Sequence, residues 1–109
     1  MSTATTSQDA AKSIRSHTGT LRRQVAEFIA NAGAKGATDE EVQIGLDMNP
    51  STERPRRGEI WAYGLITDSL GEKRATTSGR SACVWHVTSA GLKALSMAGN
   101  EWCADRMAP

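Results

Sequence analysis

The chain has few of the residues that build metal centres or cross-links. Its 109 residues include two cysteines, Cys83 and Cys103, and two histidines, His17 and His86. The cysteines are far apart and form no CxxC pair, so the sequence predicts neither a structural zinc site nor another metal site. Both cysteines are expected to be reduced thiols, as in a cytoplasmic protein.

Long apolar runs are also missing. No stretch of about twenty apolar residues is present, which argues against a membrane-spanning helix. The first residues, MSTATTSQDAAKS, lack the basic and apolar regions of a signal peptide. We therefore expect a cytoplasmic protein with no membrane association. The length favours one small domain, residues 14–98, between a flexible N-terminal tail, residues 1–13, and a C-terminal tail, residues 99–109.

Catalytic signatures are absent as well. The sequence has no glycine-rich phosphate loop, no HExxH and no GxSxG motif, so we expect a protein that is not an enzyme and that uses no cofactor. A metal-dependent nuclease would need converging carboxylates. The acids Asp39, Glu40 and Glu41 are explained by helix capping, and we expect them to lie on a helix away from the basic residues.

Two helices are predicted in the first half of the chain. Apolar residues at helical spacing predict a first helix from about Thr18, and Gly33 just after the last of them is typical of a helix end. Thr38 and Glu41 have the spacing of a capping box, in which each side chain bonds the backbone N–H of the other. The box predicts a short second helix that ends near Asp47.

Two prolines and three arginines mark the beginning of a third helix. Ser51 or Thr52 can cap it, and Pro55 is tolerated in a first turn because the amides there have no helical acceptor. Pro55 therefore predicts a helix start at about Thr52. We expect Ile60 to face inward and Gly64 to end the helix.

The periodicity changes after the third helix. Two strands, Lys73–Thr76 and Ala82–Thr88, are predicted to form a hairpin around a glycine-containing loop. In the second strand, Trp85 is expected to close the core and His86 to lie on the surface. The alternation predicts two opposite sides, one with Cys83, Trp85 and Val87 and the other with Ala82, Val84 and His86.

A fourth helix completes the predicted order of elements. Thr88 or Ser89 can cap it, and it carries Leu92 and Leu95. The expected order is helix, short strand, helix, turn, helix, hairpin, helix. The fold class is therefore mostly α with a small β-hairpin.

The stretch from about Leu21 to Gly91 resembles winged helix-turn-helix DNA-binding domains, especially those of small bacteriophage and prophage proteins. The residues that carry the resemblance are ATDEEVQIGLDMNPSTERPRRGEIWAYGLITDS and RATTSGRSACVWHVTSAG. It implies a three-helix core with a hairpin wing and an extra C-terminal helix. The sequence departs from the family pattern at Gly58 and Trp61, where an aliphatic residue or a charge is expected, and this bears on the recognition surface rather than on the fold.

The resemblance also implies a function, which is sequence-specific binding of double-stranded DNA. The third helix would enter the major groove, and the wing would lie on the backbone or minor groove. Transcriptional regulation in a phage or prophage is the expected role, with a replication or recombination accessory as an alternative. The expected contacts combine guanidinium forks, an ammonium group and hydroxyls. They are Ser51, Thr52, Arg54, Arg56, Arg57, Lys73, Arg74, Thr77, Ser78 and Arg80.

Other interpretations of these basic residues remain open. The arginines of the third helix can form a solvated face that pairs in part with Glu53 or Glu59. The hairpin loop can serve the fold alone. Arg22 and Arg23 of the first helix can contact phosphate or lie in solvent. The net charge of +1 at pH 7 also suits a rival function, a winged helix that binds a host protein as an inhibitor or adaptor.

Two tryptophans bear on the oligomeric state. If Trp61 and Trp102 are exposed, they suit a homodimer or partner interface, where large aromatic residues are enriched. If they are buried, they are ordinary packing.

Overall fold

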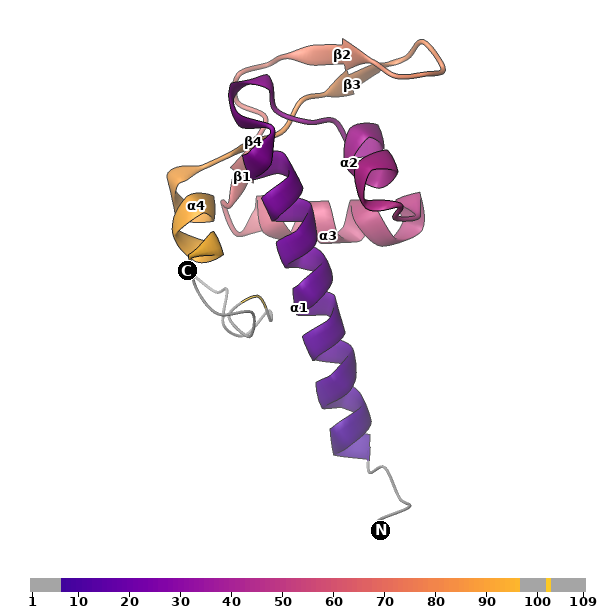
Figure 1. Ribbon diagram of the computed structural model, residues 1–109, viewed down its shortest axis with the longest axis vertical. Coiled ribbons are helices and arrows are strands. Elements are labelled where there is room, and N and C mark those ends of the chain that lie inside the picture. Colours follow the sequence, from indigo (N-terminus) through magenta and orange to yellow (C-terminus); the bar gives the residue numbers. More distant parts are fainter. Residues whose placement is uncertain (1–6, 97–101, 103–109) are drawn as a thin grey trace.

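The computed structural model describes residues 7–96 and 102, and the side chains of residues 17–96 and 102. This part of the chain is mostly helical, with four α-helices and a small antiparallel hairpin. The elements are α1 (Ser7–Asn31), η1 (Gly33–Lys35), α2 (Asp39–Leu46), α3 (Pro50–Ala62), β1 (Ile66–Thr67), β2 (Lys73–Ala75), β3 (Ser81–Cys83), β4 (His86–Val87) and α4 (Ser89–Leu95). α3 crosses α1, and the β2–β3 hairpin lies at one end of the molecule, beside α2 (Figure 1). None of the described helices has the length and apolar character needed to cross a membrane.

The first helix is longer than the sequence predicted. α1 begins at Ser7 rather than near Thr18, so residues 7–13, which we expected in a flexible tail, are helical, while residues 1–6 lie outside the described residues. The N-terminal part of α1 projects beyond the other elements (Figure 1). A helical segment that covers no core needs no apolar stripe, and this is why periodicity did not reveal it. The end at Asn31, followed by Gly33, is confirmed.

The capping box at the start of α2 is confirmed. The N–H of Glu41 donates to Thr38 Oγ1 at 3.2 Å, and the N–H of Thr38 donates to Glu41 Oε1 at 3.1 Å. At the other end, Asp47 adopts a left-handed conformation with φ 51°, and the N–H of Met48 bonds the carbonyl of Gln43 at 2.9 Å. This tight helix end lets the chain turn within three residues into α3.

The predicted start of α3 at Thr52 is wrong. The helix begins at Pro50 with Asn49 as its N-cap residue, because the fixed φ of proline suits the first helical position. Pro55 therefore lies inside the helix, where it removes one backbone hydrogen bond. Ser51, whose carbonyl loses that partner, is exposed to water. The helix end is as predicted, because Gly64 has φ 76° and follows the last turn.

The hairpin is confirmed, but its second strand is divided. β2 and β3 are antiparallel, with Lys73 opposite Cys83 and Ala75 opposite Ser81. β4 leaves the hairpin and pairs with β1. Between them, Trp85 and Ala37 exchange backbone hydrogen bonds of 2.8 and 2.9 Å. The predicted strand thus has three different partners along its length.

The change of partner makes the predicted alternation wrong. Val84, Trp85 and His86 are buried one after another, with exposed fractions of 1%, 5% and 7%. His86 was expected on the surface, but its Nε2 lies 3.1 Å from both the Ala34 carbonyl and a carboxylate oxygen of Glu72. A strand that switches from the hairpin to Ala37 and then to β1 is covered on both sides.

The core lies where α1 meets α3 and the short strands. Its buried apolar residues are Val25, Ala26, Ile29, Ala37, Val42, Ile60, Leu65, Ile66, Trp85 and Trp102. Trp102 is 1% exposed, so it is ordinary packing, and a boundary at residue 98 leaves a core residue outside the domain. Leu92 of α4 stays exposed, Cys83 is a free thiol, and Cys103 lies outside the described residues.

Candidate functional site

The three arginines of α3 point in different directions. Successive residues of a helix are separated by about 100°, so Arg56 points away from Arg54 and Arg57, which are three positions apart and lie about 60° from each other. Arg54 is exposed, whereas Arg56 and Arg57 are partly buried. Each of these two partly buried guanidinium groups forms an ion pair with a carboxylate of the protein.

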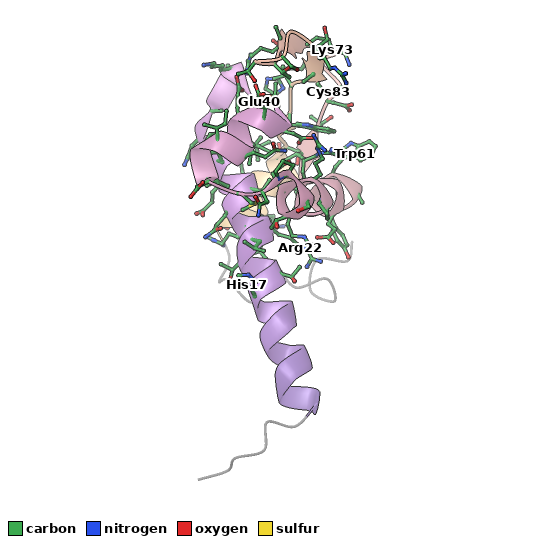
Figure 2. All side chains as sticks on the ribbon, turned by 90° about the vertical axis from the view of Figure 1, so that its right-hand side faces the viewer. His17, Arg22, Glu40, Trp61, Lys73 and Cys83 are labelled. Carbon is green, nitrogen blue, oxygen red and sulfur yellow. The ribbon has the colours of Figure 1, made fainter. Side chains whose placement is uncertain are left out.

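Arg56 belongs to an ion-pair network with α1. Its Nη2 donates to Glu59 Oε2 at 2.9 Å, and Arg22 Nε donates to Glu59 Oε1 at 2.8 Å. Burial would raise the pKa of Glu59, but the hydrogen bonds from Arg22 and Arg56 lower it below its usual value. The expected pairing with Glu59 is confirmed for Arg56. Both expectations for Arg22 are wrong, because it is only 6% exposed at the crossing of α1 and α3 (Figure 2).

Arg57 joins α3 to α2. Its Nε and Nη2 each donate to one carboxylate oxygen of Asp39 at 2.9 Å, and this bond raises the pKa of the guanidinium further. The guanidinium also lies over the Trp85 ring, 4.8 Å from its centroid. The Trp61 ring meets the Trp85 ring edge-on, and the two ring centroids are 5.8 Å apart. Arg57 is therefore a structural residue in this conformation.

The acids at the start of α2 contact α3 and the hairpin. We call Asp39, Glu40 and Glu41 the acidic cap. Glu40 accepts hydrogen bonds from the N–H and the hydroxyl of Thr77, at 3.0 and 2.8 Å. Arg74 donates to Glu41 and, at 2.6 Å, to the carbonyl of Lys35.

Our expectation that the acidic cap lies away from the basic residues is wrong. The hairpin folds over the N-terminal end of α2, so carboxylates that cap the helix also meet the hairpin. Each of the three acids engages one residue that was predicted to bind DNA. These contacts give the hairpin a part in the fold, as the alternative interpretation of its loop expects.

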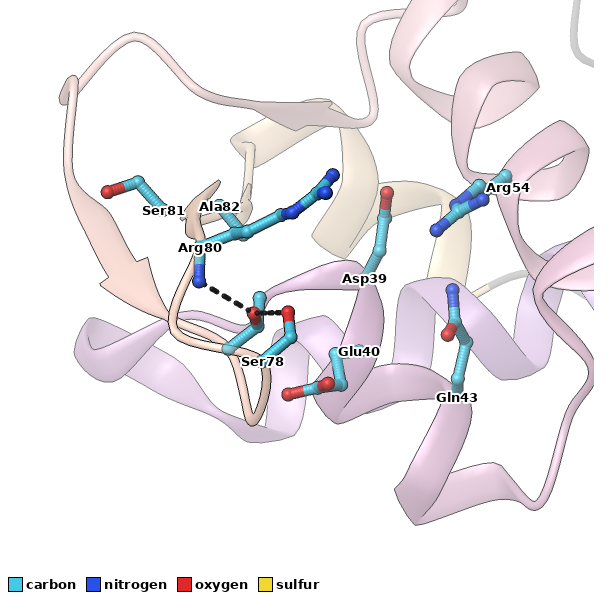
Figure 3. A pocket seen from close by; sticks show the side chains of 9 residues that line it. Asp39, Glu40, Gln43, Arg54, Ser78, Arg80, Ser81 and Ala82 are labelled. Carbon is cyan, nitrogen blue, oxygen red and sulfur yellow. Dashed lines mark hydrogen bonds between the residues drawn. The ribbon is translucent and has the colours of Figure 1, made fainter.

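Two arginines remain available, and they face one hollow. A hollow of about 440 Å³ lies between α2, α3 and the hairpin, and Arg54 and Arg80 reach it from opposite sides (Figure 3). Both arginines are exposed, and neither forms an ion pair within residues 17–96 and 102. Ser78 also lines the hollow. The structure thus brings together predicted residues from the start of α3 and from the hairpin.

The other predicted residues have separate positions. Ser51 and Thr52 lie in the first turn of α3, just before Arg54, and the N–H of Thr52 donates to the carbonyl of Asn49 at 3.0 Å. Lys73 is exposed on β2, and its Nζ lies 3.2 Å from Cys83 Sγ. Arg56, Arg57 and Arg74 are occupied by carboxylates, as described above.

Glu53 is a residue of the site that sequence reasoning missed. Its side chain is 0% exposed, and Oε1 accepts a hydrogen bond of 3.0 Å from Gln43 Nε2. Burial raises its pKa to about 8, so the carboxyl group is mainly protonated and neutral at pH 7. It therefore adds little negative charge beneath Arg54. The sequence contains no signal for this, because an acid in a first helical turn is normally exposed and ionised.

Comparisons do not identify the chain. No family model, curated protein or solved structure matches it. Within the described residues, no group of three or more His, Cys, Asp or Glu side chains could hold a metal ion. The function must be argued from the site itself.

Proposed function

We propose that the chain is a non-enzymatic, sequence-specific DNA-binding protein of winged helix-turn-helix type. In this proposal α2, the turn and α3 form the helix-turn-helix, and the β2–β3 hairpin is the wing. α3 would enter the major groove, and the hairpin would follow the backbone or the minor groove of double-stranded DNA. The observation that carries the proposal is the convergence of Arg54 and Arg80, both exposed and without a carboxylate partner in the described part, on one hollow.

The charge around this hollow supports phosphate binding. Asp39 and Glu40 also line it, but Asp39 already has two hydrogen bonds from Arg57, and Glu40 has two from Thr77. The two remaining guanidinium groups can each bond a phosphate through paired N–H groups. The first turn of α3 adds the positive end of the helix dipole.

The biological role that best fits this proposal is transcriptional regulation in a bacteriophage or prophage, in the cytoplasm of the host. The support is the resemblance of the sequence to small phage proteins of this type. A replication or recombination accessory would use the same surface.

Salt dependence tests the proposal. Binding of a labelled random DNA duplex should weaken steeply between about 50 and about 200 mM salt, because each phosphate contact releases counterions. Arg54→Ala and Arg80→Ala should each reduce the slope of log affinity against log salt by about one. Lys93→Ala, on the exposed side of α4, is the matched control and should leave the slope unchanged. Absence of duplex binding at the lowest salt would refute the proposal.

A second candidate is a module that binds another protein. It is favoured by exposed apolar side chains, namely Ile44, Leu70, Leu92 and Trp61, which is 49% exposed. It is also favoured by the internal pairing of several predicted DNA contacts. Apolar association should persist at high salt, whereas phosphate contacts should not, so the same titration separates the two functions.

A further inference from the structure

The fold gives no reason for a glycine at position 58. Gly58 lies in the interior of α3, and its φ is not positive. A Cβ atom added there would have no heavy atom within 4 Å. Glycine in a helix interior is destabilising relative to alanine, because it loses more backbone freedom on folding. An alanine would therefore fit the fold better than the residue that is present.

At three other glycines, neighbouring atoms of the protein leave no room for a side chain. At Gly36 a Cβ would lie 2.6 Å from both His86 Nε2 and the Trp85 carbonyl oxygen. At Gly91 it would collide with the Leu65 carbonyl, and at Gly45 with the Phe28 ring. These positions are filled by the protein, whereas the space over Gly58 is open. The described fold therefore supplies no internal reason for the missing side chain at Gly58, and we look for one in a partner outside the chain.

The residues beside Gly58 indicate the chemistry of that partner. Arg54 precedes it by one helical turn, and Trp61 follows it by nearly one turn, so all three lie along the same side of α3. Trp61 is 49% exposed and lies between α3 and the hairpin (Figure 2), where its ring meets the Trp85 ring edge-on. The two acids of α3 do not oppose a polyanion, because Glu53 is buried with a raised pKa and Glu59 is held by Arg22 and Arg56.

We propose that Gly58 is the point at which the backbone of α3 comes closest to DNA base edges, and that Arg54 and Trp61 are the specificity-determining contacts on either side of it. This inference rests on the proposed function and deepens it. An arginine fork fits the O6 and N7 acceptors of guanine, and an apolar surface fits the methyl group of thymine. The missing side chain lets the helix lie deeper in the groove.

Gly58→Ala distinguishes an effect on the stability of the fold from an effect on DNA recognition. A duplex is first selected from a random pool by the wild-type chain. The variant should unfold at a higher urea concentration than the wild type, yet bind the selected duplex about tenfold more weakly, as expected when one good base contact is lost. Its affinity for unselected random duplex, which depends on phosphate contacts, should stay unchanged. Trp61→Ala should lose preference for the selected duplex in the same way.

Controls distinguish this inference from the proposed function. Gln24→Ala, on an exposed position of α1, changes helix propensity elsewhere and should leave both affinities unchanged. Wild-type affinity of Gly58→Ala for the selected duplex would overturn the inference and leave DNA binding intact. Equal weakening toward selected and random duplex would also overturn it. A wild-type chain that binds no duplex at all would overturn the proposed function, and this inference with it.

Discussion

The arginines of α3 are used in two different ways. Arg56 and Arg57 are neutralised by Glu59 and Asp39. Arg54, at the hollow between α2, α3 and the hairpin, keeps its guanidinium in solvent, and Gly58, one turn later, has open space where a side chain would stand. The number of arginines in a motif therefore does not give the charge of its surface. What matters is which carboxylates the fold brings within reach.

The largest expected effect is that of a paired arginine, Arg22 of α1, which shares Glu59 with Arg56. Arg22→Ala removes a buried guanidinium that donates to Glu59 and, at 2.9 Å, to the carbonyl of Trp102. Because both acceptors would lose a buried partner, we expect a loss of about 3 kcal/mol in the free energy of unfolding. Urea denaturation followed by tryptophan fluorescence measures it. A loss of less than about 0.5 kcal/mol, the usual range for surface substitutions, would show that the network is not stabilising.

The sharpest test of the comparison is the pair Arg57→Ala and Arg54→Ala. Arg57→Ala removes two hydrogen bonds to Asp39 and the contact with the Trp85 ring, so we expect a loss of about 1–2 kcal/mol of stability. Arg54→Ala should change stability by less than about 0.5 kcal/mol while weakening duplex binding. Equal effects of the two substitutions on stability would abolish the distinction between the paired and the unpaired arginine.

Glu53 predicts a dependence of stability on pH. Its pKa is raised from 4.5 to about 8, chiefly by burial, so the folded chain holds a proton that the unfolded chain releases. The stability that this contributes is complete below about pH 4.5 and is lost as the pH rises through about 8.

Glu53→Gln provides the measurement. Glutamine keeps the acceptor for Gln43 and cannot ionise, so the variant should be more stable than the wild type at pH 8–9 by on the order of 1 kcal/mol. Its unfolding free energy should also fall less between pH 5 and pH 8 than that of the wild type. Parallel pH profiles would mean that Glu53 is not buried in its neutral form.

The smallest expected effect concerns the acidic cap. Glu40→Gln weakens the bonds to Thr77 and removes one negative charge beside Arg80. Stability should change by less than about 0.5 kcal/mol because the contact is exposed, and affinity for random duplex should rise about twofold to threefold. Glu27→Gln removes the same charge on α1, away from the hairpin, and is the control. An equal gain in both variants would indicate only a change in net charge.

Local features of the fold were predictable because they depend on neighbours in the sequence. The Thr38–Glu41 capping box, the helix end before Gly64 and the β2–β3 hairpin follow from residues a few positions apart. The start of α3 is a local feature too, but the prediction relied on Pro55, whereas Pro50 is the proline in the first turn.

The ion pairing of the arginines at the site was not predictable, because it depends on residues that are distant in the sequence. Arg57 and Asp39 are 18 positions apart, and Arg74 and Glu41 are 33 apart. The residues next to an arginine in the sequence do not show whether its guanidinium group pairs with a carboxylate or stays in solvent. The burial of His86 likewise follows from a change of strand partner that alternation cannot reveal.

The position of Trp102 has a practical consequence for anyone who shortens the chain. Its indole is the largest fully buried side chain, it lies beneath the Arg23 guanidinium, and its backbone oxygen is held by Arg22. A fragment that ends at residue 98 would lack this buried ring and would expose the side of α1 that the ring covers. Trimmed versions for crystallisation, and fusions at the carboxyl end, should therefore retain residue 102.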